Sequence, residues 1–346
     1  MFTKSLFVGP SVTLSRRRIE EGRPRALVVV ASNANVANGP AGLADAEALT
    51  AMAANAAGVS AEEMLVASTG VIGRRYPMPK LTGYFSGLGQ EDFDADAFDV
   101  ATAMMTTDTV AKTAERRVGP ARVVGVAKGV GMIEPDMATM LAFVFTDAVV
   151  ERSELEAAWR RAVDDTFNCL SVDTDTSTSD TAVVMASGVA GYVDGARLAV
   201  ALREVCLDLT LQLARDGEGA TKLLTVTVRE ARDNAQARRV AKAVLNSPLV
   251  KTAVHGADPN WGRVAMAVGK CHDDRDIDPE KVRIAFGDLE CYPNPAGPAE
   301  LSRLTELLKA DHVEITVDLR TGGAEATVYG CDLTSEYIRI NADYTT

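Results

Sequence analysis

One junction in this chain combines residue types that could supply a nucleophile without a histidine. Ala138 precedes Thr139, a stretch with glycines and a proline leads in, and an apolar, strand-like run follows over residues 140–145. A small residue in a strained turn suits attack by the threonine hydroxyl on the preceding carbonyl, which would free Thr139 as a new N-terminus. Its α-amino group, with a pKa of roughly 8, could then take the proton of its own hydroxyl. By spacing alone a structural threonine is commoner, so the junction is only a candidate.

Histidine-based catalysis has little support in this sequence. The three histidines are His255, His272 and His312, and only His255, close to Asp258 and Asn260, could line a site; a structural role is favoured for all three. The GxSxG pattern of serine hydrolases is absent, and no glycine-rich turn matches a nucleotide-binding pattern. The hydroxyl- and carboxylate-rich run over residues 171–181 could bind a cation, but a loop that satisfies its own backbone is favoured. No metal site is predicted.

The composition bounds the class of protein. The chain has 346 residues and a formal net charge of -12, which disfavours nucleic acids and anionic membrane surfaces as partners. No stretch is long and apolar enough for a membrane span. The five cysteines are odd in number and none lie at CxxC spacing, so disulfides and zinc are disfavoured and a reducing cytoplasm is expected.

The elements that would position these residues alternate irregularly along the chain. Leu43 to Ala57 has helical spacing with Gly58 as its cap, and Ser153 is a candidate cap for a helix reaching about Asn168. The two runs on either side of Gly322 and Gly323 are predicted to pair as a hairpin. Further expected strands are residues 26–31, 64–67, 123–127, 224–228 and 282–286, and further expected helices are 98–105, 193–215, 235–245 and 298–308. The pattern indicates layered α/β packing.

The candidate junction lies in a segment whose amino-acid sequence is specific enough to compare with known families. Residues 128–141, Lys-Gly-Val-Gly-Met-Ile-Glu-Pro-Asp-Met-Ala-Thr-Met-Leu, closely resemble the self-processing segment of the ornithine acetyltransferase family. Matching blocks occur in order over nearly the whole chain, at residues 32–37, 67–73, 105–109, 173–181, 216–222, 258–263 and 340–346. The amino-acid sequence is most similar to the paralogue found with clavulanic acid biosynthesis. This similarity does not distinguish a role in that pathway from a role in arginine biosynthesis.

The resemblance implies a fold and a processing event. It implies an α/β (α+β) fold, a layered αββα sandwich with a smaller C-terminal α/β lobe. It implies autoproteolysis between Ala138 and Thr139 into an α chain, 1–138, and a β chain, 139–346, assembled as an α2β2 heterotetramer or larger. Thr139 would be the nucleophile, and Thr69 and Gly70 would form the oxyanion hole. The remaining implied substrate contacts are Thr107, Lys128, Glu218, Asn341 and Thr346.

The reaction implied by the resemblance is ping-pong acetyl transfer. N2-acetylornithine would acetylate Thr139, ornithine would leave, and glutamate would take the acetyl group, with no cofactor; acetyl-CoA is a further possible donor. One alternative is a self-processing aminopeptidase or amidase in which water is the acceptor. Another is an inactive, truncated member, because the family carries an additional segment before the block that begins here at Phe2.

Overall fold

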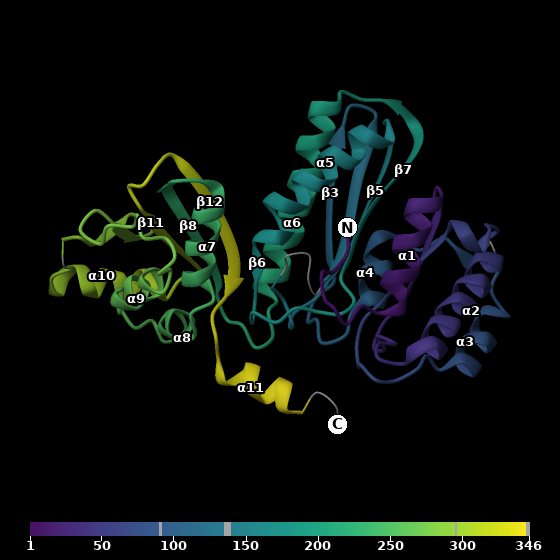
Figure 1. The fold of residues 1–346 in the computed structure, drawn as a ribbon, viewed down its shortest axis with the longest axis horizontal. Coiled ribbons are helices and arrows are strands. Elements are labelled where there is room, and N and C mark those ends of the chain that lie inside the picture. Colours follow the sequence, from purple (N-terminus) through teal and green to yellow (C-terminus); the bar gives the residue numbers. More distant parts are fainter. Residues whose placement is uncertain (90–91, 135–139, 295, 344–346) are drawn as a thin grey trace. The chain divides into compact units, whose positions relative to one another are not determined.

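The computed structural model describes residues 1–89, 92–134, 140–294 and 296–343. The chain divides into two compact units (Figure 1). Unit 1 consists of Met1–Asn168 and Asp175–Leu209, and unit 2 consists of Cys169–Thr174 and Thr210–Tyr344. Each unit has its own sheet and its own buried core, so each is described by itself.

Unit 1 contains a parallel pair of strands and a four-stranded sheet. The pair is β1 (Ala26–Val30) and β2 (Met64–Ser68), and the larger sheet has the order β3-β4-β5-β7. The strands of the larger sheet are β3 (Lys112–Val118), β4 (Ala121–Lys128), β5 (Leu141–Val149) and β7 (Thr181–Tyr192). The helices are α1 (Pro10–Glu21), α2 (Gly39–Ala57), α3 (Met78–Phe85), α4 (Ala97–Met104), α5 (Arg152–Asp165) and the first part of α6 (Gly195–Arg215), with short 3-10 turns η1 (Ala61–Glu63) and η3 (Phe167–Cys169).

The two faces of β2 bury different partners, and this creates the layers of unit 1. Leu65 and Ala67 pack with Val126, Leu141, Phe143 and Val183 of the larger sheet. Val66, on the opposite face, packs with Leu14 of α1 and Leu49 of α2, as the period of two along a strand requires. On the far face of the larger sheet, Gly125 leaves room for side chains of α6. The pair β1–β2 therefore lies between the larger sheet and helices α1 and α2, and α6 covers the other face of the larger sheet. This layering confirms the predicted α/β fold.

Unit 2 is built on one mixed six-stranded sheet. Its order is β10-β9-β11-β8-β12-β6. Helix α7 (Asn234–Leu245) packs against β8 and β12 over an apolar core of mostly aliphatic side chains. The strands are β6 (Leu170–Ser171), β8 (Leu223–Ala231), β9 (Arg283–Phe286), β10 (Leu289–Tyr292), β11 (His312–Asp318) and β12 (Ala324–Cys331), and the other helices are α8 (Pro248–Gly256), α9 (Gly262–Gly269), α10 (Pro298–Leu308) and α11 (Ser335–Ala342).

The predicted hairpin around Gly322 and Gly323 is wrong. Strands β11 and β12 do not pair with each other, because β8 lies between them, parallel to β11 and antiparallel to β12. The backbone amides of Leu319, Thr321 and Gly322 donate to carbonyls of Arg229 and Glu230 at the end of β8. The connection therefore crosses the end of β8, and at Gly322 it passes so close that a Cβ would lie 2.6 Å from the Ala231 carbonyl oxygen.

Other local predictions are borne out or corrected in detail. Helix α2 ends at Gly58, whose φ of 67° is the left-handed cap that was expected. Helix α5 begins at Arg152, with Glu151 at the cap position, so Ser153 is inside the helix and does not cap it. The long strand β7, the strand β3 and the helix α1 were not predicted from the sequence.

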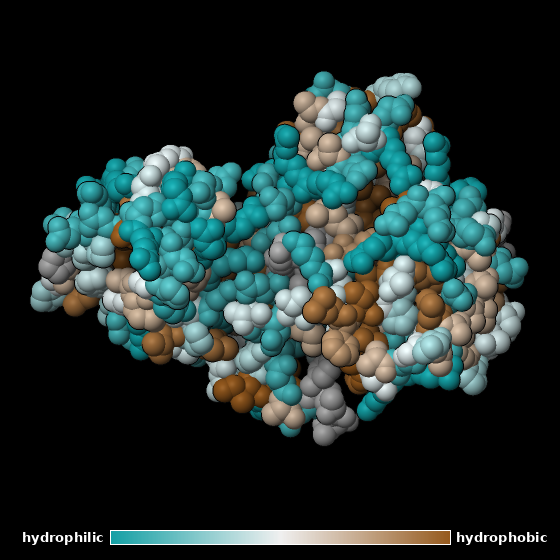
Figure 2. Space-filling model, in the orientation of Figure 1, coloured by the Kyte–Doolittle hydropathy of each residue, from teal (hydrophilic) through white to brown (hydrophobic). Residues whose placement is uncertain are grey.

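The face drawn in Figure 2 is mainly hydrophilic, with separate apolar patches. Charged residues make up 24% of the chain, which suits such a surface. Among the described residues, no helix combines the length and the apolar character needed to cross a membrane. All five cysteines are free thiols.

Candidate active site

Gly70 stands where two backbone segments approach too closely for any side chain. It follows the end of β2, has a φ of 127°, and a Cβ atom there would lie 2.2 Å from the carbonyl carbon of Ser32. The neighbouring amides, those of Thr69 and Val71, donate to the carbonyls of Val30 and Ser32 at 3.0 and 3.4 Å. Only a glycine fits this position without moving the backbone.

This backbone leaves donors suited to a developing negative charge. Since the amides on either side of Gly70 point toward β1, its own N–H points the other way, and it has no partner among the described residues. The Thr69 amide is used by the strand pairing, but the Thr69 hydroxyl has no described partner. The predicted oxyanion pair can therefore act only through the Gly70 N–H and the Thr69 hydroxyl.

Lys128 is the last residue of β4, and a neighbouring loop contacts its side chain. Its side chain is 8% exposed, and its ammonium donates to the Thr106 hydroxyl at 2.7 Å and lies 3.6 Å from the Asp108 carboxylate. Thr107, a predicted substrate contact, is half-buried in the same loop. The structure therefore brings Lys128 and the Thr107 loop together within unit 1.

Glu218 and Asn341 meet within unit 2. The Asn341 side-chain amide, on α11, donates to a Glu218 oxygen at 2.7 Å. The turn that carries Glu218 packs tightly against the start of α11, since a Cβ on Gly219 would lie 2.6 Å from the Tyr337 nitrogen. The Thr334 hydroxyl also donates to the Gly219 carbonyl at 2.7 Å. These contacts join two sequence blocks that are more than a hundred residues apart.

Three predicted residues lie outside the described part of the chain. They are Ala138 and Thr139 at the junction and Thr346 at the end. The strands around the junction are described, and one packed cluster contains Ala67 of β2, Val126 of β4 and Leu141 of β5. In the sequence each of these stands two positions from a predicted site residue: Thr69, Lys128 and Thr139. One buried core of unit 1 thus supports three strand ends that lead into the predicted site.

Comparison with known proteins identifies the family. The profile of the ArgJ family matches residues 1–346. The chain belongs to this family. The predicted membership of the ornithine acetyltransferase family is thereby confirmed.

Several relatives are similar over the whole chain. The arginine biosynthesis bifunctional protein ArgJ 2 of Nostoc sp. is 55% identical, over 100% of this chain and 89% of the relative. The glutamate N-acetyltransferase Oat2 of Streptomyces clavuligerus is 52% identical with the same coverage. A crystal structure of the arginine biosynthesis bifunctional protein argJ of Bacillus halodurans is 44% identical, with a TM-score of 0.56 over 60% of this chain and 100% of the solved chain.

The two charged residues that accompany Lys128 were missed by the sequence reasoning. Asp108 lies in a recognised block but had no assigned role, and Lys112 lies four residues further on. Their side chains are fully buried and form an ion pair of 2.8 Å. The sequence around Lys112 gives little signal, because Arg116 interrupts the apolar residues Ala114 and Val118 on the same face of β3.

Asp180, at the start of β7, is a further buried acid that the sequence reasoning missed. It is 2% exposed, and its Oδ2 atom has no hydrogen-bond partner among the described residues. Burial raises its pKa well above the usual range, although the Met140 amide, the Thr3 hydroxyl and the Lys128 charge favour the ionised form. Burial thus favours the protonated form of this carboxyl, which lies beside the strand that begins after the junction.

The surroundings of His255 do not form a catalytic triad. Its Nδ1 atom lies 2.9 Å from a buried Asp332 oxygen, and the Thr221 hydroxyl donates to that same oxygen at 2.5 Å. A triad needs the hydroxyl on the ring nitrogen opposite the carboxylate. Here both lie on the Nδ1 side, which agrees with the structural role favoured for His255. No group of three or more His, Cys, Asp or Glu in the described ranges could hold a metal ion.

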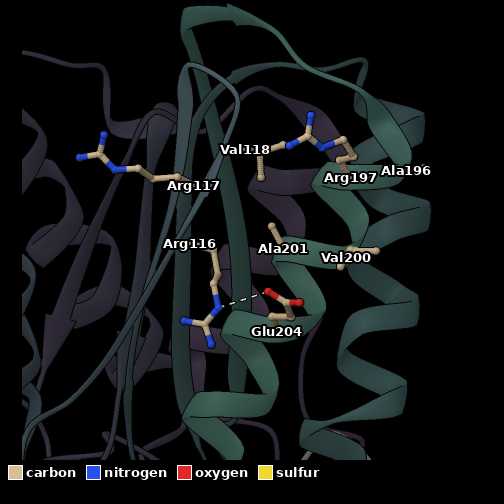
Figure 3. Close-up of a pocket in the computed structure, with 8 residues that line it drawn as sticks. All are labelled: Arg116, Arg117, Val118, Ala196, Arg197, Val200, Ala201 and Glu204. Atoms are coloured by element: carbon tan, nitrogen blue, oxygen red, sulfur yellow. Dashed lines mark hydrogen bonds and ion pairs between the residues drawn. The ribbon is translucent and has the colours of Figure 1, made fainter.

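A surface cavity of about 330 Å³ lies elsewhere in unit 1, between β3 and α6. Arg116 pairs with Glu204 across it at 3.2 Å, whereas Figure 3 shows Arg117 directed away from Glu204. None of the lining residues is a predicted site residue. The arginines do not converge on one point, so this cavity does not replace the predicted site.

Proposed function

We propose that this chain is a glutamate N-acetyltransferase that transfers an acetyl group from N2-acetylornithine to glutamate through an acetylated Thr139. The observation that supports this proposal most is the shared core of Ala67, Val126 and Leu141. This core fixes the strand ends that lie next to Thr69, Lys128 and Thr139 in the sequence. The proposal accords with the relative named glutamate N-acetyltransferase, which is 52% identical to this chain.

The proposed chemistry begins with self-cleavage before Thr139. The Thr139 hydroxyl attacks the Ala138 carbonyl, the peptide nitrogen leaves as the new α-amine, and water hydrolyses the resulting ester. This gives an α chain, 1–138, and a β chain, 139–346.

Transfer then follows in two steps. The Thr139 hydroxyl gives its proton to the α-amine and attacks the acetyl carbonyl of N2-acetylornithine, and the Gly70 N–H and the Thr69 hydroxyl stabilise the resulting oxyanion. Ornithine leaves with the proton. In the second step the neutral amine of glutamate attacks the acetyl ester, the bond to the Thr139 oxygen breaks, and the proton lost by the glutamate nitrogen restores the Thr139 hydroxyl. Lys128 would bind a substrate carboxylate, with Thr107 and Thr346 as further contacts, and Glu218 with Asn341 would bind the α-amino end. The assembly proposed is an α2β2 heterotetramer or larger, in the cytoplasm.

Intact mass spectrometry after incubation with N2-acetylornithine tests the proposal. Wild type should show two chains, with one added acetyl group on the 139–346 chain that glutamate removes. Thr139→Ala should remain a single, unacetylated chain, and Thr69→Ala should lose about 100-fold in kcat. Acetate release without glutamate would indicate a hydrolase, and a cleaved, active Thr139→Ala variant would overturn the nucleophile. Acetyl-CoA in place of N2-acetylornithine tests the second donor.

A further inference from the structure

Lys112 is a charged side chain with no access to solvent. It begins β3, its side chain is 0% exposed, and its ammonium donates to Asp108 Oδ1 at 2.8 Å and to the Val110 carbonyl at 3.3 Å. Removing an ammonium from water costs several kcal/mol even after relaxation. A fully enclosed lysine does not meet a substrate from solvent, so any contribution it makes to function passes through the groups that it contacts, and Asp108 is the carboxylate among those described here.

Asp108 joins three parts of unit 1 through one carboxylate. Its Oδ1 atom accepts from Lys112 and from the Gly129 amide, the latter at 2.8 Å. Its Oδ2 atom accepts from the Thr106 amide at 3.1 Å and lies 3.6 Å from the Lys128 ammonium. The carboxylate therefore ties its own loop to the start of β3 and to the residue at which the chain leaves β4.

The placement of Lys128 depends on Asp108 by two routes. One is the direct charge attraction at 3.6 Å, and the other is the Thr106 hydroxyl, which accepts from Lys128 while the Thr106 amide is bound by Asp108. Burial alone would raise the pKa of Asp108, but the charges of Lys128 and Lys112 overcome this and hold the pKa below its usual range. The carboxylate is thus ionised throughout the neutral range, and it is a fixed support for Lys128.

We infer that Asp108, locked by Lys112, is the positioning residue that sets the Lys128 ammonium and the Thr107 loop for the substrate's carboxylate; this rests on the proposed function of Lys128. Lys112 offsets the negative charge of Asp108, so that Lys128 is not drawn fully onto the carboxylate. Asp108 and Lys112 touch no substrate in this arrangement. They act through Lys128 and through the backbone of the loop.

A double-mutant cycle on transfer kinetics tests this inference. Asp108→Asn should lower kcat/KM by about 100-fold, chiefly through KM for the acetyl donor or acceptor, because a misplaced binding group can cost that much. In the Lys128→Met background the same substitution should cost nothing further, since its effect passes through Lys128. Lys112→Met should produce a smaller loss that also disappears in that background. If the losses simply multiply, the positioning role is wrong.

The controls separate this inference from the proposed function. Asp274→Asn alters another buried aspartate with two cationic partners, in unit 2, and kcat/KM of the folded variant should equal that of wild type. If Lys128→Met transfers normally, the proposed role of Lys128 fails first, and Thr139→Ala still reports on the nucleophile. If Asp108→Asn does not fold, the double-mutant cycle is measured with Lys112→Met and Lys128→Met instead. If both variants process their chains slowly, transfer is measured on the fraction that is cleaved, and losses that simply multiply again overturn the inference.

Discussion

Two buried aspartates in this protein are each held by two cations, yet their surroundings are opposite. Asp108 in unit 1 contacts Lys112 and lies near Lys128, whose side chains are 0% and 8% exposed. Asp274 in unit 2, itself 3% exposed, contacts the guanidinium groups of Arg232 and Arg239, which are 45% and 52% exposed. The first cluster buries all three charges, whereas the second keeps its cations in water.

The difference indicates what each cluster does. Arg239 donates two hydrogen bonds to Asp274, and this contact is the largest cause of the lowered pKa of Asp274. A planar guanidinium at the surface satisfies a buried carboxylate at small cost. Two buried ammonium groups satisfy Asp108 at a much larger desolvation cost. A fold that only needed to satisfy Asp108 could use the cheaper arrangement, so we attribute the buried lysines to the placement of Lys128.

The largest expected difference between the clusters is in stability. Lys112→Met should lower the free energy of unfolding by about 3–5 kcal/mol, because it leaves a buried carboxylate without its nearest cation. Arg239→Met should lower it by at most about 1 kcal/mol, because Arg232 remains and the lost pair is half-exposed. Urea denaturation of both variants against wild type measures the two losses. Equal losses would remove the contrast.

The contrast also shows where sequence reasoning succeeds. Helix α10 (Pro298–Leu308) and the Gly58 cap of α2 are encoded by neighbouring residues, and both were predicted. The pairing of β11 with β8 depends on residues about ninety positions apart, and the local Gly322-Gly323 signal gave a hairpin instead. Strand β7 was missed because its outer half is partly exposed and rich in small residues, so it lacks a clear apolar alternation.

The residues of the candidate site also divide into those that the sequence predicts and those that only the structure reveals. Gly70 could be placed from its family block, and the structure adds the reason, a backbone approach that excludes a Cβ. Asp108 and Lys112 could not be recognised, because the cost of burying a charge becomes visible only when its surroundings are known. An i,i+4 acid–lysine pair normally indicates an exposed helix face, and here it spans a loop and the start of a strand.

A third buried aspartate, Asp180, should change the stability of the protein with pH in the opposite direction to Asp108. Burial raises the pKa of Asp180 well above its usual value, whereas the pKa of Asp108 is below it. Because the folded pKa of Asp180 is raised, the contribution of its protonated carboxyl is fully present below the unfolded pKa of about 3.9 and is lost as the pH rises toward the folded pKa. Asp108 contributes above about pH 3.9, and this is lost as the pH falls through its folded pKa.

Asparagine substitutions at Asp180 and Asp108 distinguish these two opposite pH dependences of stability. Asp180→Asn should flatten the loss of stability as the pH rises above about 4, because the amide does not titrate. Asp108→Asn should instead destabilise the protein throughout the neutral range and reduce the further loss in acid. Thermal melting of both variants from acid to neutral pH checks the slopes. A steeper decline with rising pH in Asp180→Asn than in wild type would contradict the raised pKa of Asp180.

The smallest expected effect is the response to salt. The Debye length is about 3 Å at 1 M salt, so the half-exposed guanidinium groups around Asp274 are screened while the enclosed lysines around Asp108 are not. The stability difference between wild type and Asp274→Asn should therefore shrink by about 0.5 kcal/mol between low and high salt. The difference for Asp108→Asn should stay constant, since no counterion can enter a cluster whose nearest cation is 0% exposed. A salt dependence of equal size at both aspartates would mean that water reaches the Asp108 cluster, and the positioning role of Lys112 would then lose its physical basis.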